Sequence, residues 1–236
     1  MNIQQVKNQF PESIADIEML ESLGFSSRSH GWIETLNPQQ AEIAVWLMGK
    51  VGNDDDADTL MGVLSSQSRE LWMHAATALS LIATTKHLTG LFEILTRGVD
   101  VSQRESAAYT VSFLTNCQIN PELIQVLTEI AGNKNEPPSL RSQALEGLGN
   151  KLSEDIPTNL YDSAVQVMLE SLDDLAAEVR FWGCFAVGAV VVEQALPKLQ
   201  RLAQTDHTII PGWWSVAKEA ADSISLIQGL RGRDEN

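Results

Sequence analysis

Apolar and small residues recur in six ten-residue stretches, each with the three- and four-residue spacing of one helix face. The two clearest stretches are LRSQALEGLG (140–149) and VRFWGCFAVG (179–188). Weaker copies are QAEIAVWLMG (40–49), LWMHAATALS (71–80), QRESAAYTVS (103–112) and VAKEAADSIS (216–225). Prolines fall outside all six stretches, as helix interiors require. The pattern therefore predicts six helices of one repeated kind.

A second helical pattern lies between successive copies, at 56–66, 88–98, 121–132, 161–172 and 195–205, and a further helix is predicted at about 12–23. The copies end at positions 49, 80, 112, 149, 188 and 225, with spacings of 31, 32, 37, 39 and 37 residues. Such a period is typical of two-helix repeats that stack on their neighbours. We expect an all-α protein with one domain, an α–α superhelix of about six helix pairs. Residues 38–230 form the solenoid, 1–37 a capping helix and loop, and 231–236 a polar tail.

The repeated line VR..AA.ALG, followed by a turn and A.P.L..L, resembles HEAT repeats of the bacterial type found in phycobilin lyase subunits. The resemblance covers roughly residues 38–230 and is clearest in LDDLAAEVRFWGCFAVGAVVVEQALPKLQRLA (172–203). In that family, an Asp before the second helix and an Arg within it form a structural ladder. Asp174 and Arg180 match this pattern, Arg104 and Arg141 match the Arg position only, and Trp72, Ala41 and Ala217 depart from it. The resemblance implies a HEAT solenoid but no particular function, since this fold hosts many.

The net charge of −15 excludes several classes of partner. Nucleic acid requires clustered Lys and Arg, so neither nucleic acid nor an anionic membrane surface is an expected partner. Some HEAT-like proteins are DNA glycosylases, but such enzymes need a basic concave face. The negative charge therefore excludes this activity. A basic protein partner fits the charge, which would also speed its association.

The chain shows no secretory signal pattern at its start and no apolar run of about 20 residues, so we expect a cytoplasmic protein. Cys117 and Cys184 are far apart on apolar helical stretches. Two free buried thiols in a reducing compartment are therefore expected.

Sequence motifs for catalysis or metal binding are missing. The segment NDDDADT (53–59) places acids alternately, as a calcium loop does, but Thr59 replaces the glycine and Ser65 the bidentate glutamate of an EF-hand. Helix capping by Asn53 or Asp54 explains the acids better. The four histidines have no metal-ligand spacing, and no glycine-rich phosphate loop or G-x-S-x-G elbow occurs. We expect no cofactor, no metal and no enzymatic activity.

Repeat alignment predicts the binding surface. Counting from the Arg position of each copy, positions +1 and +5 face away from the apolar stripe and should line the concave face. Large aromatics at nominally exposed positions are informative, and here they alternate with acids. The alternative is that a tightly packed inner face buries these rings between repeats. The candidate partner-binding residues are Glu42, Trp46, Glu105, Tyr109, Glu146, Phe181, Trp182 (position +2), Phe185, Trp213 and Trp214.

Trp213 and Trp214 follow Pro211–Gly212 and are predicted to start the last helix. A terminal repeat must cover the apolar face of the repeat before it, which favours a capping role for these rings. A binding role is the alternative, and the sequence leaves both open.

The sequence favours a non-catalytic module whose acidic concave face grips a basic protein, for example as an inhibitor or immunity protein. A tetrapyrrole-binding lyase or chaperone subunit is the alternative that the resemblance implies. A structural subunit of a larger assembly is a third. A small-molecule ligand is not otherwise expected, because the predicted floor holds only His74 and Lys218 to meet acidic groups.

Overall fold

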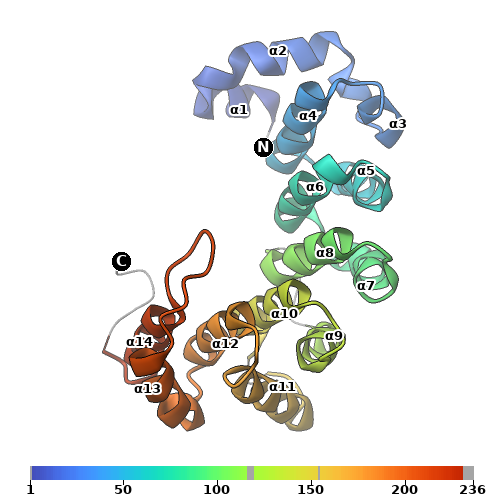
Figure 1. The fold of residues 1–236 in the computed structure, drawn as a ribbon. Helices are drawn as coiled ribbons and strands as arrows, with labels where there is room; N and C mark the ends of the chain where they lie inside the picture. Colours follow the sequence, from blue (N-terminus) through green and yellow to red (C-terminus); the bar gives the residue numbers. More distant parts are fainter. Residues whose placement is uncertain (1, 116–119, 154, 231–236) are drawn as a thin grey trace. The chain divides into compact units, whose positions relative to one another are not determined.

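The structure, a computed structural model, describes residues 2–115, 120–153 and 155–230, and its regular elements are helices (Figure 1). No strand occurs within these ranges, although Ile209 and Ser215 form an isolated antiparallel bridge. The chain divides into two compact units, Met1–Gln118 and Ile119–Asn236, so the boundary falls inside the predicted solenoid. The predicted all-α fold is confirmed.

The first unit pairs its helices in two layers. Helices α4, α6 and α8 pack side by side in one layer, and α5 and α7 pack against them. In addition, α2 packs on α4. These helices coincide with the predicted ones to within a few residues. Their bounds are α2 (Ile14–Ser22), α4 (Pro38–Val51), α5 (Asp54–Ser65), α6 (Arg69–Ile82), α7 (Leu88–Arg97) and α8 (Val101–Phe113).

The second unit repeats this arrangement, with α10, α12 and α14 in one layer and α9, α11 and α13 in the other. With α2 and α4, the described residues form six helix pairs, as predicted. We call α4, α6, α8, α10, α12 and α14 the second helices. The bounds in this unit are α9 (Pro121–Gly132), α10 (Pro138–Lys151), α11 (Thr158–Ser171), α12 (Ala177–Val190), α13 (Leu196–Thr205) and α14 (Val216–Ile227).

The N-terminal region is more helical than predicted. Helix α1 (Ile3–Gln9) was not predicted, and the loop 24–37 contains the four-residue helix α3 (His30–Ile33). Trp32, just inside α3, donates its indole N–H to the Leu23 carbonyl oxygen at 2.8 Å. Three-residue 3-10 turns complete the described helices: η1 (Pro11–Ser13), η2 (Phe25–Ser27), η3 (Thr85–His87) and η4 (Glu193–Ala195).

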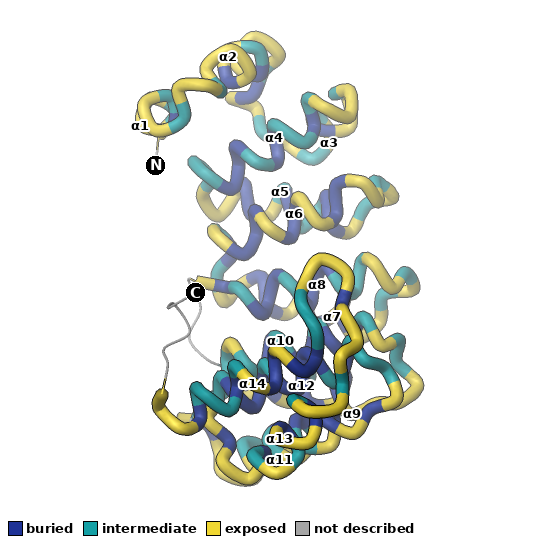
Figure 2. Tube along the Cα trace, turned by 60° about the vertical axis from the view of Figure 1, so that its left-hand side comes forward, coloured by how far each residue is buried: buried dark blue, intermediate teal, exposed yellow. Residues whose placement is uncertain are grey.

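The core of each unit lies between its two helix layers (Figure 2). Leu79 and Val111 are fully buried in the first unit, and Leu148 and Val187 in the second. Neighbouring second helices also approach closely. A methyl group on Gly188 of α12 would lie 2.5 Å from the Ser223 hydroxyl oxygen of α14. A glycine is therefore required there.

Arginines of the second helices bind aspartates that precede the next second helix. The Arg141 guanidinium holds the Asp174 carboxylate at 2.6 Å, and Asp174 also accepts the Ala176 backbone N–H. Both members of this pair are buried. The rungs are Arg69–Asp100 at 3.1 Å, Arg141–Asp174 at 2.6 Å and Arg180–Asp206 at 2.7 Å. Asp174 and Arg180 therefore belong to the ladder that the family resemblance implied.

The acids at 54–58 begin a helix, as predicted. Asn53 is the N-cap of α5, and its side chain accepts hydrogen bonds from the Asp55 and Asp56 N–H groups. The Asp56 carboxylate in turn accepts the Asn53 N–H at 2.9 Å.

Replacing Asn53 with alanine removes the acceptor for these N–H groups, so it should lower the free energy of unfolding by about 1 kcal/mol. Urea denaturation of the purified chain measures this. Calcium should leave the midpoint of the wild-type protein unchanged, and a rise with calcium would instead support a loop that binds the ion.

Candidate functional site

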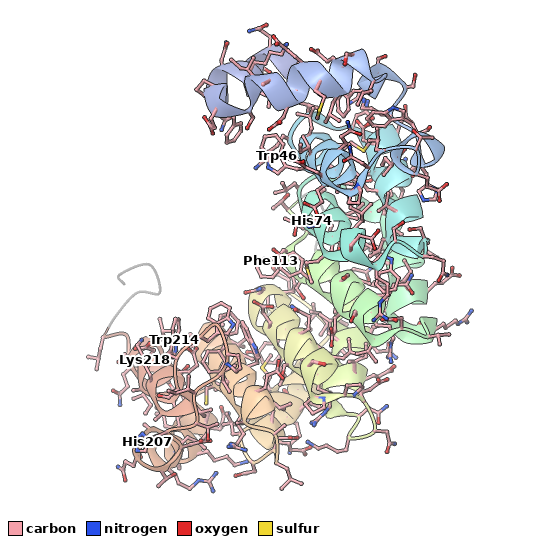
Figure 3. All side chains as sticks on the ribbon, turned by 45° about the horizontal axis from the view of Figure 1, so that its top comes forward. Trp46, His74, Phe113, His207, Trp214 and Lys218 are labelled. Atoms are coloured by element: carbon pink, nitrogen blue, oxygen red, sulfur yellow. The ribbon has the colours of Figure 1, made fainter. Side chains whose placement is uncertain are left out.

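Four of the ten predicted site residues lie in the first unit, on α4 and α8. Trp46, Glu42, Glu105 and Tyr109 are all half-buried. The Trp46 ring contacts Phe10 edge to face, with 5.4 Å between the ring centroids. The ring centroids of Tyr109 and Phe113 are 4.7 Å apart. Figure 3 shows Trp46, His74 and Phe113 projecting from one side of this unit.

Charged groups accompany these rings. The Lys50 ammonium lies 5.6 Å from the Phe10 ring centroid and 6.0 Å from that of Trp46. His74 Nε2 lies 3.9 Å from a Glu42 carboxylate oxygen. The first unit thus brings aromatic and acidic side chains to one surface, although Trp46 is already covered in part by the N-terminal segment.

Five predicted aromatic residues meet in the second unit, which we call the aromatic cluster: Phe181, Trp182, Phe185, Trp213 and Trp214. Trp182 is its centre, with ring centroids 5.4 Å from Phe181, 5.2 Å from Phe185 and 5.3 Å from Trp213. The ring centroids of Trp213 and Trp214 are 5.6 Å apart, and their ring planes are nearly perpendicular. Edge-to-face contacts of this kind are the favoured geometry for aromatic pairs.

The prediction that Phe181 and Trp182 face a partner is wrong for this structure. Phe181 is 1% exposed and Trp182 is 8% exposed. The reason is the segment 206–215, which folds back so that Trp213 and Trp214 cover both rings. Phe185 remains half-buried.

Trp213 and Trp214 do not start the last helix, because α14 begins at Val216. Trp214 is half-buried, donates its indole N–H to the buried Glu219 at 2.9 Å and carries the Lys218 ammonium over its ring at 4.5 Å. Figure 3 shows Trp214 and Lys218 together at this end of the unit. Trp213 packs on Trp182 but stays 49% exposed. Trp213 therefore remains partly exposed, whereas Trp214 anchors the segment 206–215.

Glu146 lies on α10 and is half-buried. Burial raises the pKa of its carboxyl to about 6, although the hydrogen bond from the Gln143 amide opposes this. One turn further along α10, a methyl group on Gly149 would lie 2.8 Å from the Phe185 ring. Glu146 is therefore on the face of α10 that adjoins the aromatic cluster.

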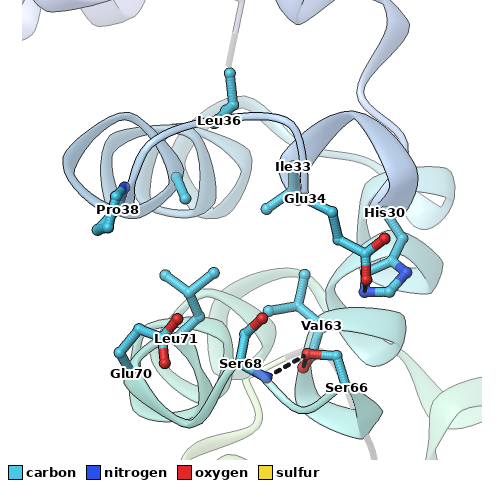
Figure 4. A pocket seen from close by; sticks show the side chains of 11 residues that line it. His30, Ile33, Glu34, Leu36, Pro38, Val63, Ser66, Ser68, Glu70 and Leu71 are labelled. Atoms are coloured by element: carbon cyan, nitrogen blue, oxygen red, sulfur yellow. Dashed lines mark hydrogen bonds and ion pairs between the residues drawn. The ribbon is translucent and has the colours of Figure 1, made fainter.

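Two hollows lie away from these residues. One cavity of about 120 Å³ in the first unit has room for a few water molecules, and Figure 4 shows His30 and Glu34 at its edge. An open groove of about 600 Å³ in the second unit runs between α9 and α11, with Glu122 and Glu129 in its lining. Neither combines the polar and aromatic groups of a small-molecule site.

No group of three or more potential metal ligands occurs in the described ranges. Cys184 is a buried free thiol, and burial raises its pKa, whereas Cys117 lies outside the described residues. No described helix is both long and apolar enough to cross a membrane.

Sequence reasoning missed several partners of the site residues. Phe10 contacts Trp46 from the position directly after the short polar helix α1, which has no apolar periodicity. Only its aromatic character could have drawn attention to it. Gln143 was overlooked because amides carry no charge signal. Arg69 forms a ladder rung although it lies three residues before the aligned Arg position.

The paired helices and the ladder define an α–α superhelix of the HEAT/armadillo class. One similar structure is the complex of CpcE and CpcF of phycocyanin lyase from Nostoc sp. PCC7120, with a TM-score of 0.55, 19% identity and coverage of 73% of this chain and 97% of that chain. Another is a designed armadillo repeat protein in complex with the peptide (KR)4, with a TM-score of 0.53 and 17% identity. The match covers 83% of this chain and 97% of that chain. These likenesses establish the fold. No family model and no curated protein matches the sequence.

Proposed function

We propose that the protein is a non-catalytic binding module that grips a basic partner protein through aromatic and acidic side chains on and beside its second helices. The observation that carries this proposal is Trp213. A large ring that packs on an aromatic cluster and still exposes half its surface is the kind of residue that anchors protein interfaces.

Charge supports a basic partner. The chain carries a net charge of −15, and Glu42, Glu105 and Glu146 accompany the aromatic side chains of the second helices. Acidic groups around aromatic anchors favour a positively charged, partly apolar surface on the other side. A protein of the same fold, the designed armadillo repeat protein, is in complex with the peptide (KR)4. An inhibitor of a basic enzyme or toxin would be a concrete form of this function.

Affinity capture from the native host tests the proposal. Tagged wild-type chain should retain a basic protein that salt releases, and Trp213→Ala should lose it, because the variant removes the exposed ring. Leu175→Ala is the matched control, because Leu175 is fully exposed on the loop before α12 of the same unit. Circular dichroism checks that both variants are folded. A captured partner that is acidic, or that Trp213→Ala still binds, would contradict the proposal.

The likeness to the phycocyanin lyase complex favours a second candidate, a tetrapyrrole-binding subunit. Propionate groups of a tetrapyrrole would need free cations, but the Lys218 ammonium at the aromatic cluster is already paired with Asp222 at 2.7 Å. We therefore rank this function second. Absorbance titration with a bilin decides the point, since a shifted visible band at micromolar protein would favour the lyase-like function.

A further inference from the structure

Glu146 is a half-buried carboxylate that has no cation among its described neighbours. The Glu146 carboxylate accepts a hydrogen bond from the neutral amide of Gln143 on the same helix. Burial of an acid without a cation disfavours its charged form and raises the pKa of the Glu146 carboxyl to about 6. A residue that opposes folding in this way is a candidate for binding, because the bound ligand can supply what the free protein lacks.

A second buried polar group on the same helix is the Ser142 hydroxyl. Ser142 lies one turn before Glu146 and is 1% exposed, and its hydroxyl has no hydrogen-bond partner among the residues that the structure describes. Buried polar groups are almost always paired, so an orphan calls for an explanation. Ser142 and Glu146 are four residues apart on α10 and therefore share one face.

This face of α10 adjoins aromatic side chains. The Phe185 ring of α12 lies against Gly149, one turn after Glu146, and Trp182 and Trp213 continue the row of rings from Phe185. The same cluster already accommodates one cation, since the Lys218 ammonium lies over Trp214 at 4.5 Å. Trp213 is the most exposed of the five rings.

We propose that Glu146 and the adjoining edge of the aromatic cluster form an anchor for one arginine side chain of the basic partner. The guanidinium pairs with the Glu146 carboxylate and lies against the rings that extend from Phe185 toward Trp213. The proposal rests on the proposed function and adds to it the chemical group that the partner must present.

Guanidinium chemistry fits these groups better than an ammonium does. A guanidinium is planar, carries five N–H donors and is weakly hydrated, so it can pair with a carboxylate and stack on rings at the same time. The half-buried position of Glu146 also favours it, because a strongly hydrated ammonium loses more on leaving water. Opposite charge nearby would lower the pKa of the Glu146 carboxyl back toward its ordinary value.

Fluorescence anisotropy with dye-labelled (KR)4 and the full chain tests the anchor at low ionic strength. We expect Glu146→Gln to weaken binding about tenfold, as the loss of a charge-assisted hydrogen bond predicts. Glu170→Gln on α11 is the matched control. It removes the same charge from the same unit, and Glu170 also accepts a hydrogen bond from a glutamine of its own helix, Gln166, at 2.8 Å. This control should change the affinity less than twofold.

The outcomes separate the anchor from the wider function. Equal losses in Glu146→Gln and Glu170→Gln would overturn the anchor and leave a general attraction between acidic surface and basic partner. Octalysine that binds as tightly as (KR)4 would overturn the preference for guanidinium. No binding of (KR)4 by the wild-type chain would overturn the proposed basic partner itself. Glu146→Gln keeps the size of the side chain, so loss of fold does not complicate the comparison.

Discussion

Replacing Asp174 with asparagine should lower the free energy of unfolding by about 3–5 kcal/mol, the usual cost of breaking a buried ion pair. The Arg141 guanidinium donates to both Asp174 carboxylate oxygens, at 2.6 and 3.2 Å, and both residues are less than a tenth exposed. The variant leaves Arg141 charged and buried without its counter-ion. Lys134, which also binds Asp174 at 2.7 Å, is exposed and can turn to solvent.

Urea denaturation at pH 7 measures the effect, and Asp100→Asn is the control. Asp100 forms the equivalent rung with Arg69, but that arginine side chain is 65% exposed. An exposed pair contributes about 0–1 kcal/mol, and asparagine can still cap α8 in place of Asp100. Equal costs for the two variants would show that burial of the rung does not determine its contribution.

The Asp174 rung also predicts acid sensitivity. Burial would raise the pKa of the Asp174 carboxyl, but hydrogen bonds from Arg141 and Lys134 outweigh it and hold the pKa below its ordinary value of 3.8. A carboxyl with a depressed pKa stabilises the fold above its unfolded pKa and loses that contribution as pH falls toward the folded value. The loss of stability caused by Asp174→Asn should therefore reach its full size above about pH 5 and should shrink below about pH 4.

Glu146→Gln should stabilise the protein, in contrast to Asp174→Asn. We expect it to raise the free energy of unfolding by about 1–2 kcal/mol at pH 7.5. The pKa of the Glu146 carboxyl rises from 4.5 to about 6 on folding, because burial disfavours the charged form. Each unit of pKa difference corresponds to about 1.4 kcal/mol, and partial exposure reduces the sum. The folded state holds the proton more tightly, so ionisation opposes folding fully above about pH 6 and not at all below about pH 4.

Denaturation at pH 7.5 and at pH 4 checks this sign. The gain should vanish at pH 4, where wild-type Glu146 is protonated in both states. Glu170→Gln, at an exposed position, should change the stability by less than about 0.5 kcal/mol at either pH. A loss of stability in Glu146→Gln at pH 7.5 would mean that an unrecognised group neutralises the carboxylate in the free protein.

The helix pairs were predictable because each second helix repeats one pattern of apolar and small residues, and the periods 31 to 39 imply a first helix between copies. Helix α1 was missed because Ile3–Gln9 buries only Val6 and begins with an Asn2 capping box that carries no hydrophobic signal. Local capping, and not periodicity, determines that helix.

The site was predictable only in part. The repeat alignment identified Phe181, Trp182 and Phe185, whereas Trp213 and Trp214 drew attention as an adjacent pair of tryptophans. The alignment assigned Phe181 and Trp182 to the surface, but both are buried. Their burial depends on the return of residues 206–215, a tertiary contact that no local pattern encodes. The alignment also included Glu146, but neither its burial nor that of the Ser142 hydroxyl can be read from a local pattern, because both depend on tertiary packing.

Segment 206–215 is tied to the beginning of α14 by its backbone. The Val216 N–H donates to the Thr208 carbonyl at 3.0 Å, and the Ala217 N–H donates to the Asp206 carbonyl at 2.7 Å. These are helix N-terminal amides, which have no acceptor within their own helix. Their exchange with solvent deuterium therefore reports the opening of the segment that carries Trp213. A partner that holds Trp213 should slow exchange at Val216 and Ala217, two amides that it never touches.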